Sequence, residues 1–467
     1  MNFPKLDRCG FAATAVILLG SAIIILCARG ELWFDEVLSL QWAKNAATPW
    51  QLLTLYRHDN NHLLNSLWIW LVGPGAPELL LRSFSIACGV ATLVLIYLLA
   101  GLLSPRVRLV PLILAAGSYA LVLYSSEARG YAPALASSLG CLWIWLRHDG
   151  RPTIGSVTAF WVLGLAGLLS HPSIVYVFGA IACWQLCRNR ICSCAWLENF
   201  RAAFWWFSFP GLMALVLYFV FFRGMDVAGG PTLSPPVIAA DFFGYGLGLP
   251  EWKNHPWAAV VSGFFLILVA LVWGEHRWPG QRVFFVAALL VLPVVAYWIS
   301  GRDYVYFRYF LVCLPLLCLL LGCLVERLWT ISVGGRFVVV LAVSAVLAIQ
   351  IPRLFELAWQ GRGSCREALA IILRESKGPT DVFSDHDMMI GMVFEHYRAG
   401  WPDGSLLRYQ TQWSMPSGTC EWLLAGSSAE VLPEIREIEG RVFRHVETLY
   451  RPRVSGTDWI LYRRDPM

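Results

Sequence analysis

Charged residues are scarce in this chain. Only 14% of its 467 residues are charged, while 57% are hydrophobic. A soluble domain carries about 25% charged and about 45–50% apolar residues, so this composition excludes an ordinary soluble protein. The apolar residues come in runs of roughly 16–22, which is about what a helix needs to cross a bilayer core of ~30 Å. We therefore expect a polytopic α-helical membrane protein.

Patterns that indicate other classes of protein are also missing. The 13 cysteines are scattered, mostly inside apolar runs, and form neither an evenly spaced framework nor the repeated CxxC pair of a zinc site. The sequence shows no internal repeat and no low-complexity tract. The net charge of +5 is modest, and basic residues lie in short loops, which argues against nucleic-acid binding. The first apolar run lacks an A-x-A cleavage pattern and is expected to remain as an anchor.

The apolar runs predict about eleven transmembrane helices. They are expected at residues 11–28, 83–103, 109–124, 131–146, 154–169, 173–187, 203–222, 257–274, 282–299, 308–325 and 336–352. Two further segments are expected at the membrane interface. The stretch from Trp42 to Tyr56 is compatible with an amphipathic surface helix, and residues 63–81 form a helical candidate that Pro74 and Pro77 shorten.

The composition changes after about residue 352, where runs shorten and charges rise. A helix near 362–376, a strand at 381–384, a helix near 387–398 and later strands are expected. The pattern predicts a membrane domain over 1–352 and a small α/β domain over 353–467. Cys365 and Cys420 both lie in this second domain, where they either form a disulfide or remain free thiols.

Within residues 1–352, the loops on one side of the expected spans hold most of the basic residues. These are Lys5, Arg8, Arg106, Arg108, Arg147, Arg151, Arg188, Arg190, Arg201, Arg277, Arg282, Arg327 and Arg336. Positive charge marks the cytoplasmic side, so the N-terminus is expected there. An odd number of spans then places the C-terminal domain and the loop after the first span outside the cytoplasm.

Two adjacent carboxylates, Asp35 and Glu36, follow the first apolar run. Neighbouring side chains on a helix point about 100° apart, so one acid can face a cavity while the other binds a partner. A carboxylate near a hydroxyl is a competent general base. With Asp59 it is also a candidate ligand for a divalent cation such as Mg²⁺, Mn²⁺ or Ca²⁺. The simpler alternative is that both acids stabilise the start of a helix.

Three further groups of polar residues are expected on the same side as Asp35. The first is His58-Asp59-Asn60-Asn61-His62, where Asp59, Asn61 and His62 suit hydrogen bonds to a polyhydroxylated or phosphorylated ligand; alternatively, the segment caps a helix. The second is Glu127-x-Arg129-x-Tyr131, in which the arginine either binds a phosphate or pairs with Glu127 or Asp35.

The third group is formed by Arg308 and Tyr309, at the head of an expected span. A cation there either holds a phosphate or extends to the lipid headgroups. His171, in the turn between two spans, is a candidate ligand-binding residue or a structural histidine at a helix end.

Taken together, these motifs resemble the GT-C glycosyltransferases of bacteria. The match is closest to the branch that includes protein mannosyltransferases and the aminoarabinose transferase of lipid A, and it covers roughly residues 1–350. The resemblance rests on Asp35-Glu36, the polar cluster, Arg82-Ser83, Ser125-Ser126-Glu127-Ala128-Arg129-Gly130-Tyr131-Ala132, Arg308-Tyr309-Phe310-Leu311 and Pro315. The chain departs from the pattern at Asn61-His62-Leu63-Leu64-Asn65, where many relatives carry a His-Pro-Pro-Leu-Tyr type of sequence.

The resemblance implies an inverting transferase in the bacterial cytoplasmic (inner) membrane. Its donor would be a polyprenyl-phosphate-linked sugar, and its acceptor a lipid, glycan or protein. In such enzymes an aspartate of the first outer loop acts as base or helps to bind metal, a role that falls on Asp35, with Glu36 beside it. The alternatives are a transporter or flippase for a lipid-linked solute, and a non-catalytic relative that binds a polyprenyl lipid.

Overall fold

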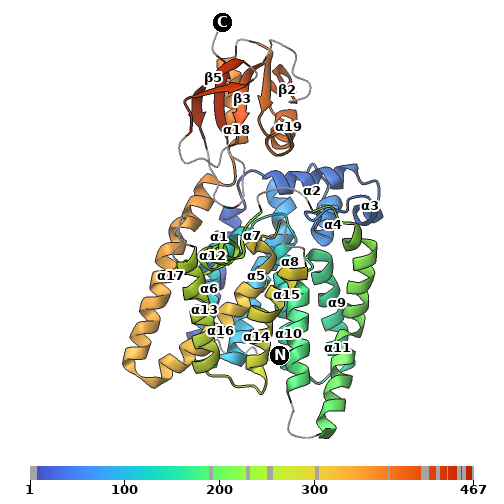
Figure 1. The fold of residues 1–467 in the computed structure, drawn as a ribbon, viewed down its shortest axis with the longest axis vertical. Helices are drawn as coiled ribbons and strands as arrows, with labels where there is room; N and C mark the ends of the chain where they lie inside the picture. The colour runs from blue at the N-terminus through green and yellow to red at the C-terminus, as the bar shows by residue number, and fades with distance from the viewer. Residues whose placement is uncertain are drawn as a thin grey trace.

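The computed structural model describes residues 8–188, 193–227, 232–249, 256–299, 304–376, 378–411, 420–426, 432–438, 440–449, 454 and 459–464. It consists of a bundle of long helices and a smaller α/β part that lies on one end of the bundle (Figure 1).

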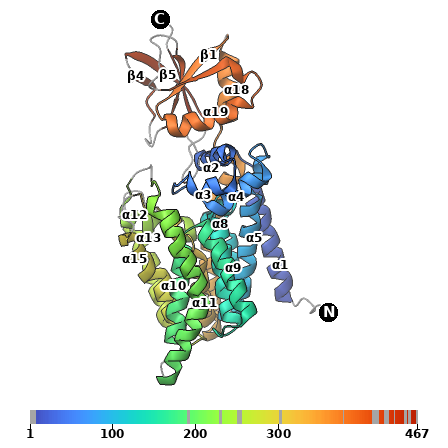
Figure 2. The same cartoon turned by 90° about the vertical axis from the view of Figure 1, so that its right-hand side faces the viewer.

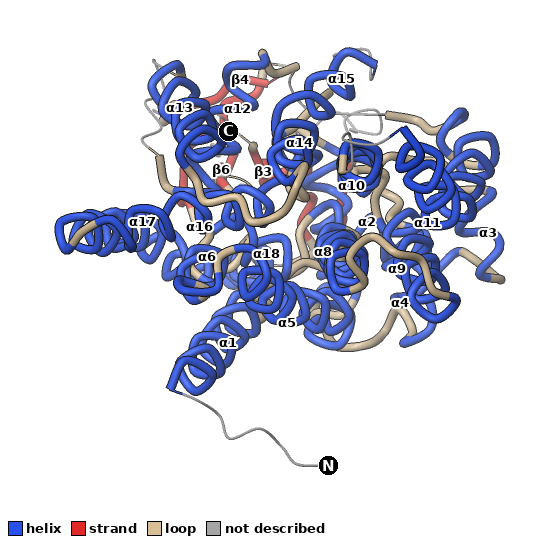
Figure 3. Tube along the Cα trace, turned by 90° about the horizontal axis from the view of Figure 1, so that it is seen from below, coloured by secondary structure: helices blue, strands red, loops and turns tan. Residues whose placement is uncertain are grey.

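The apolar runs form the helices of the bundle. These are α1 (Arg8–Cys27), α5 (Glu78–Leu103), α6 (Leu109–Ala116), α7 (Tyr119–Ser125), α8 (Tyr131–Arg147), α9 (Ile154–Ser170), α10 (Ile174–Cys187), α11 (Ser193–Val220), α12 (Pro235–Leu247), α13 (Trp257–Trp273), α14 (Gln281–Val286), the π-helical η3 (Ala287–Val291), α15 (Leu292–Ile299), α16 (Cys313–Ile331) and α17 (Val333–Gln360). Seen from below, α1 and α17 lie at the rim of the bundle (Figure 3).

In the described part of the chain, six helical segments are long and apolar enough to cross a membrane. They are Cys9–Cys27, Glu78–Leu103, Trp196–Gly224, Gln281–Ile299, Cys313–Ile331 and Val333–Gln360. Helices α9, α10 and α13 are apolar but shorter, so the expected number of eleven spans is not reached by helix length alone.

One expected span, 109–124, is broken into α6 and α7. The chain leaves helical geometry around Gly117 and Ser118, and the polar groups freed there find partners on other helices. Tyr119 N donates to Gln350 Oε1 of α17 at 3.2 Å, and Ser118 Oγ donates to Gly246 O of α12 at 2.9 Å. A break is tolerated in an apolar bundle because these groups remain hydrogen-bonded.

Three short helices lie between the bundle and the α/β part (Figures 1 and 2). They are α2 (Phe34–Asn45), α3 (Pro49–Thr54) and α4 (Leu63–Val72). The single interfacial helix expected over Trp42 to Tyr56 is therefore wrong, because α2 ends before Pro49, which begins α3. The helix shortened by Pro74 and Pro77 is confirmed as α4.

The α/β part contains α18 (Cys365–Glu375), α19 (Met392–Ala399) and one six-stranded sheet of order β2-β1-β3-β6-β5-β4. The strands are β1 (Thr380–Ser384), β2 (Leu407–Gln410), β3 (Cys420–Ala425), β4 (Ile435–Ile438), β5 (Arg441–Thr448) and β6 (Ile460–Arg464). Strand β1 runs parallel to β2 and β3, with Val382 opposite Trp422, and the remaining pairs are antiparallel.

One sequence expectation at this end of the chain needs correction, and one open alternative is decided. Helix α17 continues past residue 352 to Gln360, so the expected domain border falls inside a helix. Cys365 and Cys420 are both buried free thiols, and no disulfide joins them. The Sγ atom of Cys365 contacts Val393 O, whereas that of Cys420 contacts Asp381 O.

The α/β part and the bundle share an apolar core. Leu32, Val37 and Leu40, from the start of α2 and the loop before it, pack in one cluster with Leu369 of α18 and Phe394 of α19. All five side chains are buried. Burial contributes roughly 1.5–3 kcal/mol for each large apolar side chain. The shared cluster therefore stabilises the contact between the α/β part and α2.

Candidate active site

The polar residues singled out in the sequence converge at the end of the bundle that faces the α/β part. The Arg129 Nη1 atom lies 3.0 Å from Asp35 Oδ2. The Tyr131 ring lies 5.0 Å from the His62 ring and 4.8 Å from the His171 ring, measured between centroids. The His171 ring in turn lies 5.7 Å from Tyr309. Five segments that are distant in sequence therefore build one site.

Asp35 is held by groups from two other loops. Its Oδ2 faces Arg129, whose Nη2 donates to Asn60 Oδ1 at 2.8 Å. Asn60 Nδ2 donates back to the carbonyl oxygen of Asp35 at 2.7 Å. Burial would lower the pKa of Arg129, but Asp35, together with Tyr131 and Glu127, raises it overall. The Asp35 side chain remains 12% exposed, so it is accessible from the site.

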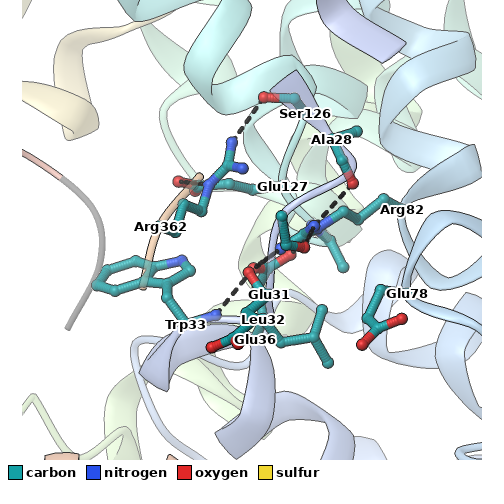
Figure 4. A network of polar contacts seen from close by, with 12 residues as sticks. Ala28, Glu31, Leu32, Trp33, Glu36, Glu78, Arg82, Ser126, Glu127 and Arg362 are labelled. Atoms are coloured by element: carbon teal, nitrogen blue, oxygen red, sulfur yellow. Dashed lines mark hydrogen bonds and ion pairs between the residues drawn. The ribbon is translucent and has the colours of Figure 1, made fainter. Parts of the chain in front are cut away.

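Glu36, the neighbouring acid, is fully enclosed. Arg82 binds both of its oxygens, with Nε to Oε1 at 2.7 Å and Nη2 to Oε2 at 2.6 Å (Figure 4). The backbone N–H groups of Ala128 and Trp33 donate to the same carboxylate. Burial would raise the pKa of Glu36, but Arg82 and these donors lower it overall.

Glu36 therefore has neither exposure nor a free oxygen for proton transfer, since its side chain is 0% exposed. Through its bond to Trp33 N, it also supports the first turn of α2, as the helix-start alternative expected. We interpret Glu36 as a structural residue rather than as the catalytic residue that the sequence suggested.

Asp59 is bound from both sides. Its Oδ1 lies 2.9 Å from His58 Nδ1, and its Oδ2 accepts a hydrogen bond from Tyr309 Oη at 3.0 Å. Burial would raise the pKa of Asp59, but His58, Tyr309 and the nearby Arg308 lower it overall. The loop is fixed by Asp226, whose carbonyl oxygen accepts from Asp59 N at 3.0 Å.

Arg308 lies in the short helix η4 (Phe307–Phe310), with its guanidinium 4.5 Å from the Tyr306 ring centre. Among the described residues it has no ion pair, and its Nε atom is buried without a hydrogen-bond partner. Burial would lower its pKa, but the surrounding groups, led by Tyr131 and Asp35, raise it well above the ordinary value. Arg308 is thus a partly exposed cation beside the site.

The two histidines of the site are neutral. His62 Nδ1 lies 3.1 Å from Ser170 O, and His171 Nδ1 lies 2.8 Å from Ser173 Oγ. Burial, with the nearby Arg129 cation, lowers the pKa of His62 well below its ordinary value and that of His171 to about 3. Gly130 allows this packing, because a Cβ there would lie 2.1 Å from Ser170 O and 2.7 Å from His62 Cβ.

These neutral histidines predict how stability depends on pH. The pKa of His171 falls from 6.5 to about 3 on folding, so between these values the unfolded chain binds more protons. Stability is therefore full above the unfolded value and falls as the pH drops, by about 1.4 kcal/mol per pH unit for this group. His171→Asn keeps an acceptor near Nδ1 and should reduce this slope, measured as unfolding temperature in detergent from about pH 7 to about pH 5.

A matched control for this prediction is His445→Asn in the α/β part, where the side chain is exposed. The control should keep the slope of the native protein. An unchanged slope in the His171→Asn protein would contradict a neutral, buried His171.

Several buried polar atoms of this site have no hydrogen-bond partner. Among the described residues they include His62 Nε2, Tyr131 Oη, Arg129 Nε and Arg308 Nε. Buried polar atoms in native proteins are nearly always hydrogen-bonded to protein or water, so this cluster offers hydrogen-bonding groups to a polar ligand or to water. The cluster offers two cations, two neutral imidazoles, a phenol and the carboxylates of Asp35 and Asp59.

Two residues that were predicted to bind a ligand make their polar contacts within the protein instead. Asn61 Nδ2 donates to the carbonyl oxygens of Leu52 and Tyr56, and Asn61 Oδ1 accepts from Ser66 Oγ. Glu127 is fully buried behind Arg129. We interpret both as residues that hold the loops of the site rather than as ligand-binding groups.

The donor set does not fit the predicted metal site at Asp35 and Asp59. Asp35 faces the guanidinium of Arg129, and Asp59 is bound by His58 and Tyr309. In the residues that the structure describes, no group of three or more His, Cys, Asp or Glu side chains is arranged to hold a metal ion.

Sequence reasoning missed three residues that organise the site. In the sequence, Asn60 stands out only as part of a polar run and Arg82 only as the first residue of a span. Arg362 does not stand out. An arginine inside an apolar helix, such as Arg82, must find a carboxylate partner because its charge is costly to bury. This rule could have predicted the partner of Arg82. It does not apply to Arg362, which lies in a linker between helices.

No protein-family model matches the chain, and no curated protein sequence matches it. Solved structures do match. ArnT from Cupriavidus metallidurans bound to undecaprenyl phosphate is 12% identical, with a TM-score of 0.46 over 98% of both chains. An Archaeoglobus fulgidus oligosaccharyltransferase tethered with an acceptor peptide is 12% identical, with a TM-score of 0.46 over 82% of this chain and 63% of that one. The arabinofuranosyltransferase AftD from Mycobacteria is 12% identical, with a TM-score of 0.48 over 98% and 40%.

These structures are GT-C glycosyltransferases. They belong to the group that the sequence motifs resemble. At 12% identity and TM-scores below 0.5, the likeness is distant in both sequence and geometry, and the resemblance of this chain stays a prediction.

Proposed function

We propose that the protein is a membrane glycosyltransferase that moves a sugar from a polyprenyl-phosphate donor to an acceptor hydroxyl, with inversion. One observation carries the proposal. A cation without an ion pair, Arg308, and an accessible carboxylate, Asp35, lie at the same cluster of unpartnered buried polar atoms. The chemistry of the cluster fits an anionic group at one end and a hydroxyl-bearing group at the other.

The anionic end of the donor would bind at Arg308. Guanidinium groups form strong charge-assisted hydrogen bonds with phosphate oxygens. The Nε–H of Arg308 and the phenol of Tyr131 are both buried and unused, so each can donate to a phosphate oxygen. Positive charge fixed here would stabilise the negative charge that develops on the leaving phosphate.

Asp35 would act as general base. It would take the proton of the acceptor hydroxyl while the acceptor oxygen attacks C1 of the sugar. The new C1–O bond forms as the C1–O bond to phosphate breaks, and polyprenyl phosphate leaves with the electron pair. Because the phosphate is already a stable anion, no acid has to protonate it. A single displacement inverts the anomeric centre.

The proposed topology follows from the charges of the loops. We propose eleven crossings of a bacterial inner membrane, with a cytoplasmic N-terminus and an extracytoplasmic C-terminal domain. Exposed arginines near the other end of the bundle, such as Arg282 and Arg327, suit the cytoplasmic side. The polyprenyl tail would lie between the helices, and the acceptor would be a lipid, a glycan or a protein.

A flippase is the main competing function. Transporters place ionisable residues near the membrane midplane. Here Asp35, in the first turn of α2, contacts Arg129, and Asp59 contacts Tyr309, which is next to Arg308 in η4. These residues lie at helix ends and in the segments between helices. This placement favours a reaction at the membrane surface over transport across the membrane.

The function can be tested by mass spectrometry of lipids and glycans from cells with and without the protein. The expected result is loss of one glycosylated product and accumulation of its unmodified acceptor. The purified full chain, given polyprenyl-phosphate-linked hexoses and pentoses with a membrane lipid extract, should then release free polyprenyl phosphate. No product change in cells and no release from any of these donors would overturn the proposal.

Arg308→Gln is expected to weaken binding of polyprenyl phosphate by about 10- to 100-fold, because hydrogen bonds to a charged group contribute about 1.5–3 kcal/mol. The measurement is the dissociation constant of polyprenyl phosphate for the purified protein. Arg327→Gln, an exposed arginine near the other end of α16, is the matched control and should bind as the native protein does. If the Arg308→Gln protein bound polyprenyl phosphate as tightly as the native protein does, Arg308 would contact only the lipid headgroups of the membrane.

A further inference from the structure

Arg362 belongs to the short linker between α17 and α18, yet its side chain is 0% exposed. Its Nη1 donates to Cys27 O at 2.7 Å, at the end of α1. Its Nη2 donates to Ser126 Oγ at 2.6 Å, and its Nε lies 3.4 Å from Glu127 Oε1 (Figure 4). The linker to the α/β part thus inserts a charge into the core of the bundle.

This arginine is the last member of a row of alternating charges that begins at the proposed base. Asp35 lies 3.0 Å from Arg129, Arg129 lies 3.8 Å from Glu127, and Glu127 lies 3.4 Å from Arg362. Arg129, Glu127 and Arg362 are buried, and only the Asp35 side chain keeps some exposure, at 12%. Interactions between charges are strong in such surroundings because little water screens them.

The docked α/β part fixes the position of Arg362. The Glu31 carboxylate accepts hydrogen bonds from the N–H groups of Cys365 and Arg366, at 2.7 and 2.9 Å, and so caps the start of α18. Tyr397 Oη of α19 accepts from Leu32 N at 2.6 Å. These contacts tie the α/β part to the loop that leads into Asp35.

We propose that Arg362 is a positioning residue for Asp35, acting through Glu127 and Arg129, so that docking of the α/β part sets the geometry of the site. The inference rests on the proposed function, because Asp35 is the proposed base.

The physical reason is competition for one guanidinium. Arg129 faces two carboxylates, and Arg362 neutralises the inner one, Glu127. Without Arg362, the buried charge of Glu127 would draw Arg129 inward and away from Asp35. Asp35 would then lose its orientation towards the acceptor, although its own carboxylate would remain.

The test compares three variants of the full chain by release of polyprenyl phosphate. Arg362→Gln should lower kcat by about 10- to 100-fold, since a displacement near 1 Å costs about 10²-fold, and should change the donor KM by less than about threefold. Adding Glu127→Gln to this variant removes the competing charge and should restore most of kcat. Arg366→Gln, which breaks an exposed ion pair with Glu78 in the same region, is the matched control and should retain activity.

Two outcomes would overturn the inference. One is a native kcat in the Arg362→Gln protein. The other is a low kcat that the second substitution does not restore, while the unfolding temperature shows that both proteins are folded. Failure of the proposed function would look different, because native protein would then release no polyprenyl phosphate.

Discussion

Replacing Asp35 with asparagine should lower the rate of polyprenyl phosphate release by about 10²- to 10⁴-fold, the usual contribution of a general base. Asparagine is nearly the same shape but cannot accept the proton. The fold around it should persist, because Asn60 binds the carbonyl oxygen of Asp35 rather than its carboxylate. The loss should therefore appear in kcat, with little change in the affinity for polyprenyl phosphate.

The matched control is Asp403→Asn, which makes the same chemical change at an exposed residue of the α/β part. Asp403 has a left-handed backbone, with φ of 57°, that asparagine also tolerates. The control should retain full activity. Normal product formation by the Asp35→Asn protein would reject the catalytic assignment.

Replacing Arg82 with methionine should have the largest effect on folding. Arg82 is buried, binds both oxygens of Glu36 and donates to the carbonyl oxygens of Ala28 and Glu31. Removing one partner of a buried ion pair leaves an uncompensated charge and costs about 3–5 kcal/mol. We expect a much lower yield of folded protein and a lower unfolding temperature in detergent.

A second substitution separates the charge from the packing. Arg82→Met together with Glu36→Gln removes both charges and keeps an acceptor for Ala128 N, so much of the lost stability should return. Arg106→Met, an exposed arginine in the turn after α5, should be neutral. If the double variant were no more stable than Arg82→Met, the lost hydrogen bonds to the backbone would explain the effect instead of the charge.

Asp35 and Glu36 are adjacent acids with different roles. The sequence presented Asp35 and Glu36 as an equivalent pair. Their side chains leave α2 in different directions, as the helical rotation of about 100° per residue requires. One direction leads to Arg129 and the polar cluster, and the other to Arg82. Both acids pair with an arginine, and the prediction that one of them faces a cavity stays a prediction.

Other parts of the site were predictable as a set but not residue by residue. Loop charges and motif order predicted that Asp59, Arg129, His171 and Arg308 share one side of the membrane. In the structure they belong to one cluster, which Tyr131 and Tyr309 connect. Asn61 could not be distinguished from its neighbours in this way. Its side-chain amide donates to the backbone carbonyl oxygens of Leu52 and Tyr56, and no sequence pattern predicts these contacts.

The sequence by itself determined that this is a helical membrane protein with a small α/β part, because hydrophobic run length and strand alternation are local properties. It also determined which loops carry polar chemistry. Only the tertiary structure decided that Asp35 is accessible while Glu36 is enclosed, and that Arg362 reaches the same charge network from a distant linker. The reason is that burial and charge pairing depend on residues up to hundreds of positions apart, and no local pattern encodes those distances.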